Sequence, residues 1–276
     1  MLTTAARPPA RTNERTDAAS SLGAVTAMCI TGAGARPVAA DSLPTVMLAV
    51  AVSRAGAGGA RSRISVHVYE GEAAAFAPPG AGGGGGGGAA ALRWTACGKF
   101  PVRPAPGADG TADSVMSMCW IEDAAGGGLA ARNAPALIVG TRARCRAYVS
   151  HRQFNRWEAA PEILDVPMSP EHGCACVAWA PGSMDRTTGP ASTSVMAAAA
   201  SGSEVLLLNV GRHEGEDGVD ENRGGRVVAR LRHEEEVEAV AWNVIGSVLA
   251  TTDAGGATKL WGPNLMSEWE ERQTVC

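Results

Sequence analysis

The sequence predicts an all-β fold, and three observations support this prediction. Apolar segments are short, about five to seven residues, and clusters of Gly, Pro, Asp and Ser separate them, as in strands joined by turns. No segment shows the periodicity of an amphipathic helix. A pattern of three strands also recurs along the chain. We therefore expect sheets built from consecutive strands.

The recurring unit is an apolar strand that ends in Trp, then a strand of small and aliphatic residues, then a third strand. Three units follow this order, and a weaker one, without the Trp, precedes them. The expected strands are 25–30, 46–52 and 64–70 in the weak unit; 115–120, 136–140 and 143–149 in the next; then 174–179, 195–201 and 204–210; and finally 237–242, 247–252 and 257–261.

The spacing of the units predicts long loops. Trp120, Trp179 and Trp242 lie further apart than the roughly 40 to 45 residues of a compact WD blade. The additional residues fall in low-complexity stretches, chiefly a Gly-rich insertion at 71–91 and an acidic loop at 213–225. Such insertions are tolerated at strand junctions because the entropic cost of closing a loop grows slowly with its length.

The composition of the strands favours a propeller over a sandwich. Small residues dominate the second strand of each unit, as would suit a strand close to a narrow central axis with a sheet on each side. The Trp that ends each first strand would fill the space between neighbouring sheets, with its indole N–H needing one partner. We expect residues 25–276 to form an incomplete or open WD-repeat β-propeller of about four recognisable blades, after a disordered N-terminus at 1–24.

Charge and composition argue against several functional classes. The net charge is −4, whereas phosphate binding depends on clustered positive charge, so we expect no direct contact with nucleic acid. The longest apolar stretches, 46–52 and 195–200, fall far below the ~20 residues that a helix needs to span a membrane. The seven cysteines show no disulfide framework and favour a reducing compartment.

Two motifs suggest ligand sites but lack the remaining requirements. The glycines at 82–88 are not followed by the Lys and Ser or Thr of a phosphate-binding loop, so a flexible linker is the better interpretation. Cys174 and Cys176, with His172 nearby, have the wrong spacing for a zinc knuckle, and no second pair accompanies them. On a strand they would share one face, as core or interface thiols. We expect no cofactor and no metal.

Catalytic residues are not evident either. The clusters at 213–221 and 233–236 combine His with several acidic residues, but both lie between expected strands, where a run of charge is usually a solvated surface. Ser, His and Asp occur without a nucleophile elbow or a comparable order. We therefore expect no enzymatic activity.

The C-terminal residues show a specific resemblance to a known family. Over 226–276 the chain resembles the final blade of the Seh-type WD-repeat nucleoporin, a subunit of the Y-shaped outer-ring complex of the nuclear pore. The resemblance is looser over 157–210. The matching features are Trp242-Asn243, the segment 246–250, the turn at 253–256, Lys259-Leu260-Trp261, and Asn264-Leu265-Met266 with Trp269. The family has six blades, more than the four units found here, and paired acids where this chain has Asp253 and Ala254.

The resemblance implies a structural function. The chain would be a scaffold of the nuclear pore outer ring, at the nuclear envelope, and would serve nucleocytoplasmic transport of protein and mRNA. The family is also shared with a nutrient-sensing complex at the lysosome or vacuole surface. The implied partners are other outer-ring subunits and a larger α-helical nucleoporin that completes the open propeller, so we expect no closed ring from this chain alone. Unpaired edge strands would then be the docking site of that partner. The resemblance makes six residues fold-bearing: Trp120, Trp179, Trp242, Asn243, Asp253 and Trp261.

Two alternatives remain open. One is the related WD-repeat subunit of the outer cage of coat-protein-II vesicles, from which Asn243 and the tail at 266–269 point away. The other is a substrate adaptor or the propeller domain of an enzyme. That function would need a basic or aromatic pocket on the propeller top, where this chain has mostly Gly, Ala and acidic residues.

Overall fold

The all-β prediction is confirmed by the computed structural model. Within the described residues every regular element is a strand, and the strands form four antiparallel sheets that follow one another along the chain. The structure describes residues 24–30, 46–54, 63–71, 94–102, 114–121, 135–151, 156–181, 195–210 and 225–275.

Each sheet is a meander in which consecutive strands are hydrogen-bonded neighbours. The first sheet contains β1 (Ala24–Ile30), β2 (Val46–Arg54), β3 (Arg63–Gly71) and β4 (Trp94–Pro101). The second contains β5 (Val115–Ile121), β6 (Ala136–Thr141), β7 (Arg144–His151) and β8 (Arg156–Ala159), with the short β9 (Asp165–Pro167) also paired to β7. The third contains β10 (Cys176–Trp179), β11 (Val195–Ser201), β12 (Glu204–Val210) and β13 (Arg226–Arg232). The fourth contains β14 (Val237–Trp242), β15 (Leu249–Asp253), β16 (Thr258–Pro263) and β17 (Trp269–Val275).

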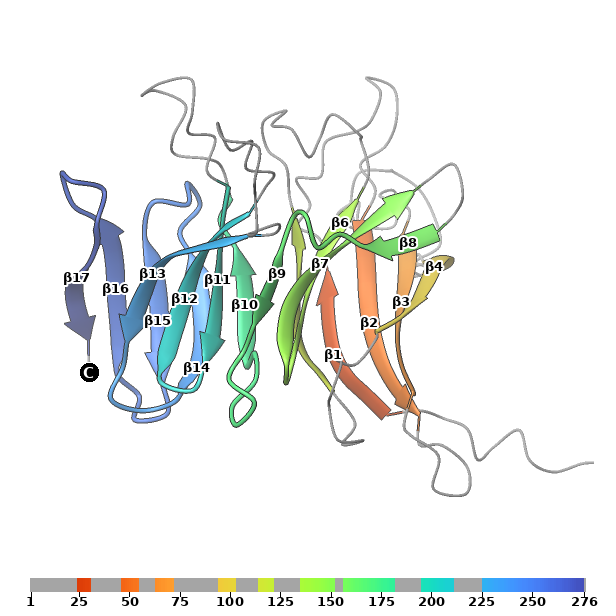
Figure 1. The fold of residues 1–276 in the computed structure, drawn as a ribbon, viewed down its shortest axis with the longest axis horizontal. Coiled ribbons are helices and arrows are strands. Elements are labelled where there is room, and N and C mark those ends of the chain that lie inside the picture. The colour runs from red at the N-terminus through yellow and green to blue at the C-terminus, as the bar shows by residue number, and fades with distance from the viewer. Residues whose placement is uncertain are drawn as a thin grey trace, which may run out of the picture.

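The four sheets stack side by side in chain order, with the first sheet at one end of the molecule and the fourth at the other (Figure 1). This arrangement is the predicted open, incomplete β-propeller with four blades. The sequence patterns reveal three strands per unit but not the fourth strand of each sheet. The fourth strands carry charges because they lie at the outer edge, as in Arg-Val-Val-Ala-Arg-Leu-Arg of β13.

One expectation about the blades is wrong. The first strands β1, β5, β10 and β14 contact one another in turn, so they, and not the second strands, form the inner row. The small residues of β11 have a different explanation, which is that this second strand is covered on both faces. In β11, Ala197 and Ala199 pack toward the second sheet while Ala198 and Ala200 pack toward the fourth, and all four are fully buried.

Each pair of neighbouring sheets encloses its own hydrophobic core. In two of these cores, small residues of the second strand of one sheet face larger residues of the next sheet. Between the first and second sheets, Ala49 and Ala51 face Trp120, Leu137 and Tyr148. Between the third and fourth, Ala198 and Ala200 face Val237, Leu249 and Trp261. The Trp-ended strand therefore fills the space between blades, as the sequence predicts.

Three sequence features fall outside the described residues. They are the expected disordered N-terminus up to residue 23, the Gly-rich insertion from residue 72 with its glycines at 82–88, and the acidic loop from 213 to 224.

Candidate functional site

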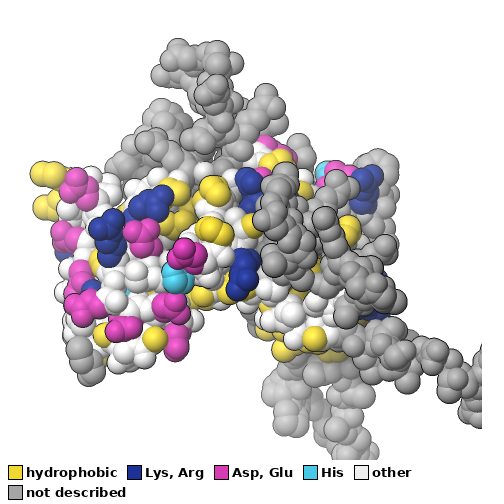
Figure 2. Space-filling model, turned by 60° about the horizontal axis from the view of Figure 1, so that its bottom comes forward, with side chains coloured by type: hydrophobic (Ala, Val, Ile, Leu, Met, Phe, Trp, Pro, Cys, Tyr) yellow, Lys and Arg dark blue, Asp and Glu magenta, His cyan; other side chains and the backbone are white. Residues whose placement is uncertain are grey.

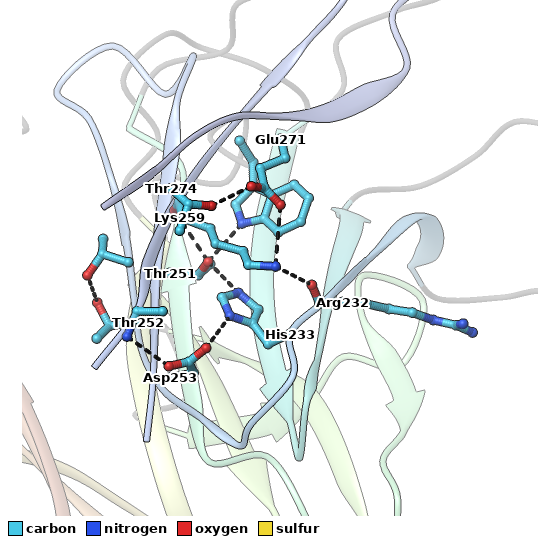
Figure 3. A network of polar contacts seen from close by, with 11 residues as sticks. Arg232, His233, Thr251, Thr252, Asp253, Lys259, Glu271 and Thr274 are labelled. Carbon is cyan, nitrogen blue, oxygen red and sulfur yellow. Dashed lines mark hydrogen bonds and ion pairs between the residues drawn. The ribbon is translucent and has the colours of Figure 1, made fainter. Parts of the chain in front are cut away.

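The fourth sheet holds a buried polar network centred on His233, which follows β13 (Figure 3). The His233 side chain is 0% exposed. Its Nδ1 donates to Asp253 Oδ2 at 3.2 Å, and its Nε2 lies 2.7 Å from Thr251 Oγ1. Trp261 Nε1 donates to the same Thr251 Oγ1 at 2.7 Å. The strands β15 and β16 and the β13–β14 connection are therefore tied together by one chain of hydrogen bonds.

Asp253 also closes the following turn. Its Oδ1 accepts from the Ala257 amide at 3.0 Å, and Gly256 supplies the left-handed conformation that the turn requires, with φ of 84°. The turn hydrogen bond is therefore made by Asp253, although Ala254 replaces the second acid of the family pattern.

The solvated interpretation of the 233–236 cluster is wrong for His233, although Glu234, Glu235 and Glu236 are exposed as expected. His233, ahead of β14, and Trp261, in β16, occupy the positions of His and Trp in the Gly-His…Trp-Asp signature of WD repeats. That order was available in the sequence, but Arg232 and Gly262 replace the flanking Gly and Asp and obscure it.

The hydrogen bonds of Asp253 predict that the folded state loses stability at acidic pH. The hydrogen bond from His233, opposed by burial and supported by the Ala257 amide, holds the pKa of Asp253 below its usual value. A carboxylate with a depressed pKa in the folded state stabilises the fold above the unfolded pKa of about 3.9, and that contribution is lost as pH falls through the folded pKa. We expect the thermal unfolding midpoint to fall between about pH 5 and pH 3, and to fall less steeply in Asp253→Asn. Circular-dichroism melts across this range measure both, and equal slopes would contradict the assignment.

The same sheet ends in two hairpins whose tips expose large apolar side chains. Val244 and Ile245 lie on the β14–β15 turn and Leu265 and Met266 on the β16–β17 turn, with exposed fractions of 90%, 61%, 106% and 82%. Both turns project from the same end of the sheet, because alternate connections of a meander share an end. We call these four residues the tip surface.

The two turns are built alike. Asn243 Oδ1 accepts from the amides of Ser247 and Val248, and Asn264 Oδ1 accepts from those of Met266 and Glu268. The fourth residue of each turn has a positive φ, 71° at Gly246 and 63° at Ser267. Ser267 is the one described non-glycine residue in this conformation, which is uncommon outside Gly and Asn. The turns are therefore defined by Asn and the left-handed residue, and nothing in their geometry requires the apolar pairs between.

Two tryptophans join the bases of the hairpins. Trp242 precedes the first turn and Trp269 follows the second, and their rings pack edge to face with centroids 5.6 Å apart. Trp242 Nε1 also donates to the Ala178 carbonyl of the third sheet at 3.3 Å. The tip surface is thereby held on a rigid base.

The six predicted fold-bearing residues lie at the interfaces between sheets, in the His233 network and in one hairpin of the tip surface. Trp120 is buried between the first and second sheets, and Trp179 is half-buried against the core of the second and third. Trp242 lies between the third and fourth sheets. Asp253 and Trp261 meet in the His233 network, while Asn243 orders a hairpin of the tip surface. The other members of the His233 network are His233 and Thr251, and Asn264 orders the second hairpin of the tip surface. Of these three residues, only Asn264 is among the features that match the nucleoporin family.

The Cys-x-Cys pair does not share one face. Cys174 lies ahead of β10 and packs into the core of the second and third sheets, whereas Cys176 faces the fourth. The alternation rule fails because residue 174 is outside the strand. His172 points elsewhere, with Nδ1 2.9 Å from Glu236 Oε1. Burial raises the pKa of Cys176 to about 12, so this thiol stays protonated near neutral pH.

Two further observations apply to the described part of the chain alone. It contains no group of three or more His, Cys, Asp and Glu side chains arranged to hold a metal ion. None of its segments forms a helix with the length and apolar character needed to cross a membrane.

Comparison with known proteins assigns no family to the chain. No family model matches it, and no curated protein is similar to it. Among solved structures it is similar to Sqt1 of Chaetomium thermophilum, with 14% identity and a TM-score of 0.45 over 87% of this chain and 43% of that one. The structure of Chaetomium thermophilum Sqt1 bound to the N-terminus of ribosomal protein L10 has 15% identity and a TM-score of 0.45, over 87% of this chain and 45% of that one. A chain of the Chaetomium thermophilum Polycomb Repressive Complex 2 bound to GSK126 has 9% identity and a TM-score of 0.39, over 55% of this chain and 29% of that one. The chain spans less than half the length of each of these solved chains.

Proposed function

We propose that the chain is a protein-binding scaffold and that it docks a partner through the tip surface. The observation that carries this proposal is the exposure of Val244, Ile245, Leu265 and Met266 on turns that do not require apolar residues. Exposed apolar patches with a polar rim mark interaction sites, because water solvates them poorly. Here Asn243, Ser247, Asn264 and Glu268 form the rim.

Within the scaffold class we propose a place in the outer ring of the nuclear pore, at the nuclear envelope, with a larger α-helical nucleoporin as the partner. The support is the resemblance over 226–276, whose matching features include Leu265 and Met266 of the tip surface and the two tryptophans beneath it, Trp242 and Trp269. An amphipathic helix would offer the apolar stripe that the tip surface needs.

The proposal is tested by localisation. The tagged chain should stain the nuclear rim in its own cell, and a variant with Ser at all four tip positions should not. The control Val275→Ser removes an exposed apolar residue from the end of β17 and should keep the rim staining. Both variants change exposed positions, so the free energy of unfolding should change by less than about 0.5 kcal/mol per substitution.

A binding experiment separates docking from mislocalisation. Co-expressed wild-type chain and helical partner should co-elute from a size-exclusion column, and the tip variant should elute alone. Rim staining by the tip variant would contradict the docking surface. Punctate exit sites for the wild type would contradict the nuclear pore and support the vesicle coat.

A further inference from the structure

The stack of four sheets leaves one sheet face open at each end. At one end, the fourth sheet has one face against the third sheet, because Leu249, Thr251 and Asp253 of β15 are buried there. The residues between them in β15, and their cross-strand partners, point away from the third sheet. They are Ala239, Ala241, Ala250, Thr252, Thr258 and Leu260. We call these six residues the C-terminal open face.

At the other end the first sheet presents the opposite kind of surface. Ala49 and Ala51 are buried against the second sheet, so their neighbours in β2 face away from it. Leu48, Val50 and Val52 are paired across strands with Ile30, Met28 and Val25. The three β1 residues are 55%, 68% and 61% exposed. We call these six residues the N-terminal open face, and none of the other described sheets covers it.

The two open faces match the two sides of the interfaces inside the molecule. The small face of the third sheet has Ala178 paired with Ala198 and Ala198 with Leu207, and the fourth sheet repeats this order as Ala241, Ala250 and Leu260. In the third sheet that row is covered by the fourth, whereas in the fourth sheet Ala239 and Ala241 are exposed.

The N-terminal open face matches the larger side in the same way. Ile30, the last residue of β1, lies opposite Leu48, as Trp120 near the end of β5 lies opposite Leu137 and Trp242 at the end of β14 lies opposite Leu249. Ile30 thus occupies the position at which the following sheets carry the tryptophan that fills the space between blades. The first sheet has the face that would pack on a sheet like the fourth.

The charges around the two faces are also complementary. His67 and Lys99 are cross-strand partners beside the N-terminal open face, and Arg54 ends β2. Burial lowers the pKa of His67, and the positive charges of Lys99 and Arg54 lower it further. At the fourth sheet Glu234, Glu235 and Glu238 are exposed, Glu236 is paired with His172, and acidic side chains gather over that end of the molecule (Figure 2).

The acidic residues lie at the matching end of the sheet. The Ala254 amide, in the β15–β16 turn, donates to the Glu236 carbonyl at 2.8 Å. Arg54 stands at the equivalent β2–β3 turn of the first sheet. Because blades repeat one orientation, stacking a first sheet on a fourth would bring these opposite charges to the same end.

We propose that the N-terminal open face of one copy packs on the C-terminal open face of a second copy, continuing the stack of blades from chain to chain. Such a contact is heterologous. If the curvature of the stack allows it, two copies close into a ring of eight blades, and otherwise the assembly extends by further copies. The contact does not use the tip surface, through which we propose that the helical partner docks, so the two proposals are tested by different variants.

A mixing experiment tests the two faces against each other. Met28→Glu should prevent packing through the N-terminal open face and Ala241→Arg through the C-terminal open face, because each substitution would bury a charge in the contact. At micromolar concentration, light scattering should give the wild type at least twice 28.1 kDa, and each variant alone should be monomeric. An equimolar mixture should recover a species of two chains and no larger, because each variant retains one intact face that the other can use.

The controls separate this proposal from the preceding one. Leu265→Arg alters the tip surface and should leave self-association unchanged, while Met28→Glu should leave nuclear-rim staining unchanged. Val25→Glu with Ala239→Arg replaces the first pair if circular dichroism shows that either variant has lost the wild-type fold. A monomeric wild type, a self-associating single variant, or a mixture of folded variants that stays monomeric would each overturn the proposal.

Discussion

The variant Thr251→Val should lose about 3 kcal/mol of the free energy of unfolding, because removal of one hydroxyl leaves two buried donors or acceptors without a partner. Thr251 Oγ1 accepts from Trp261 Nε1 and lies 2.7 Å from His233 Nε2. Val has the shape of Thr, so the packing around position 251 is kept and the loss reports hydrogen bonding. Urea unfolding followed by circular dichroism, at one low protein concentration so that self-association does not contribute, measures the difference.

The adjacent threonine provides a matched control. Thr252 belongs to the same strand but faces the open side of the sheet, where its hydroxyl pairs with Thr258 at 3.0 Å. Water can replace that contact, so Thr252→Val should lose less than about 1 kcal/mol. Equal losses in the two variants would show that the His233 network does not stabilise the fourth sheet.

The first three strands of the Trp-marked units can be predicted because burial controls their sequence. A strand covered on one or both faces must be apolar, and β6, β11 and β12 are recognisable for that reason. Outer strands such as β13 and β17 lie at the edge, where charged residues are tolerated, so their residues resemble a loop. The inner position of the first strands could not be read from residue size, because the small residues of β11 reflect burial on both faces of that strand and not its distance from the axis.

The candidate sites divide in the same way. Trp261 and Asp253 stand out locally, as the end of a strand and the start of a turn, and both are found in the network. His233 follows an arginine-rich strand and precedes three glutamates, so local composition hides a buried side chain. Burial of His233 depends on Thr251 and Asp253, which lie at a distance of 18 and 20 residues along the chain, and only the fold brings them together.

The variant Trp120→Ala should have a larger effect, a loss of about 4 kcal/mol, because it removes the indole from the core between the first and second sheets and leaves a cavity. Trp120 is 5% exposed and packs edge to face on Trp157, with ring centroids 6.0 Å apart. Trp157 in turn stacks on Phe100 of the first sheet at 5.4 Å. The cavity would therefore open beside the aromatic group that joins the two sheets.

Trp120→Phe shows whether ring volume or the indole N–H is responsible. Trp120 Nε1 is buried without a hydrogen-bond partner among the described residues, whereas Trp261 Nε1 donates to Thr251. Replacing Trp120 by Phe gives up no hydrogen bond in the described structure and keeps an aromatic ring against Trp157, so it should recover most of the stability lost in Trp120→Ala. Trp261→Phe should lose more than Trp120→Phe, because it leaves the Thr251 hydroxyl with one partner fewer in a buried site. The reverse order in urea unfolding would mean that the tryptophans at the blade interfaces are chosen for their polar atom and not for the space that they fill.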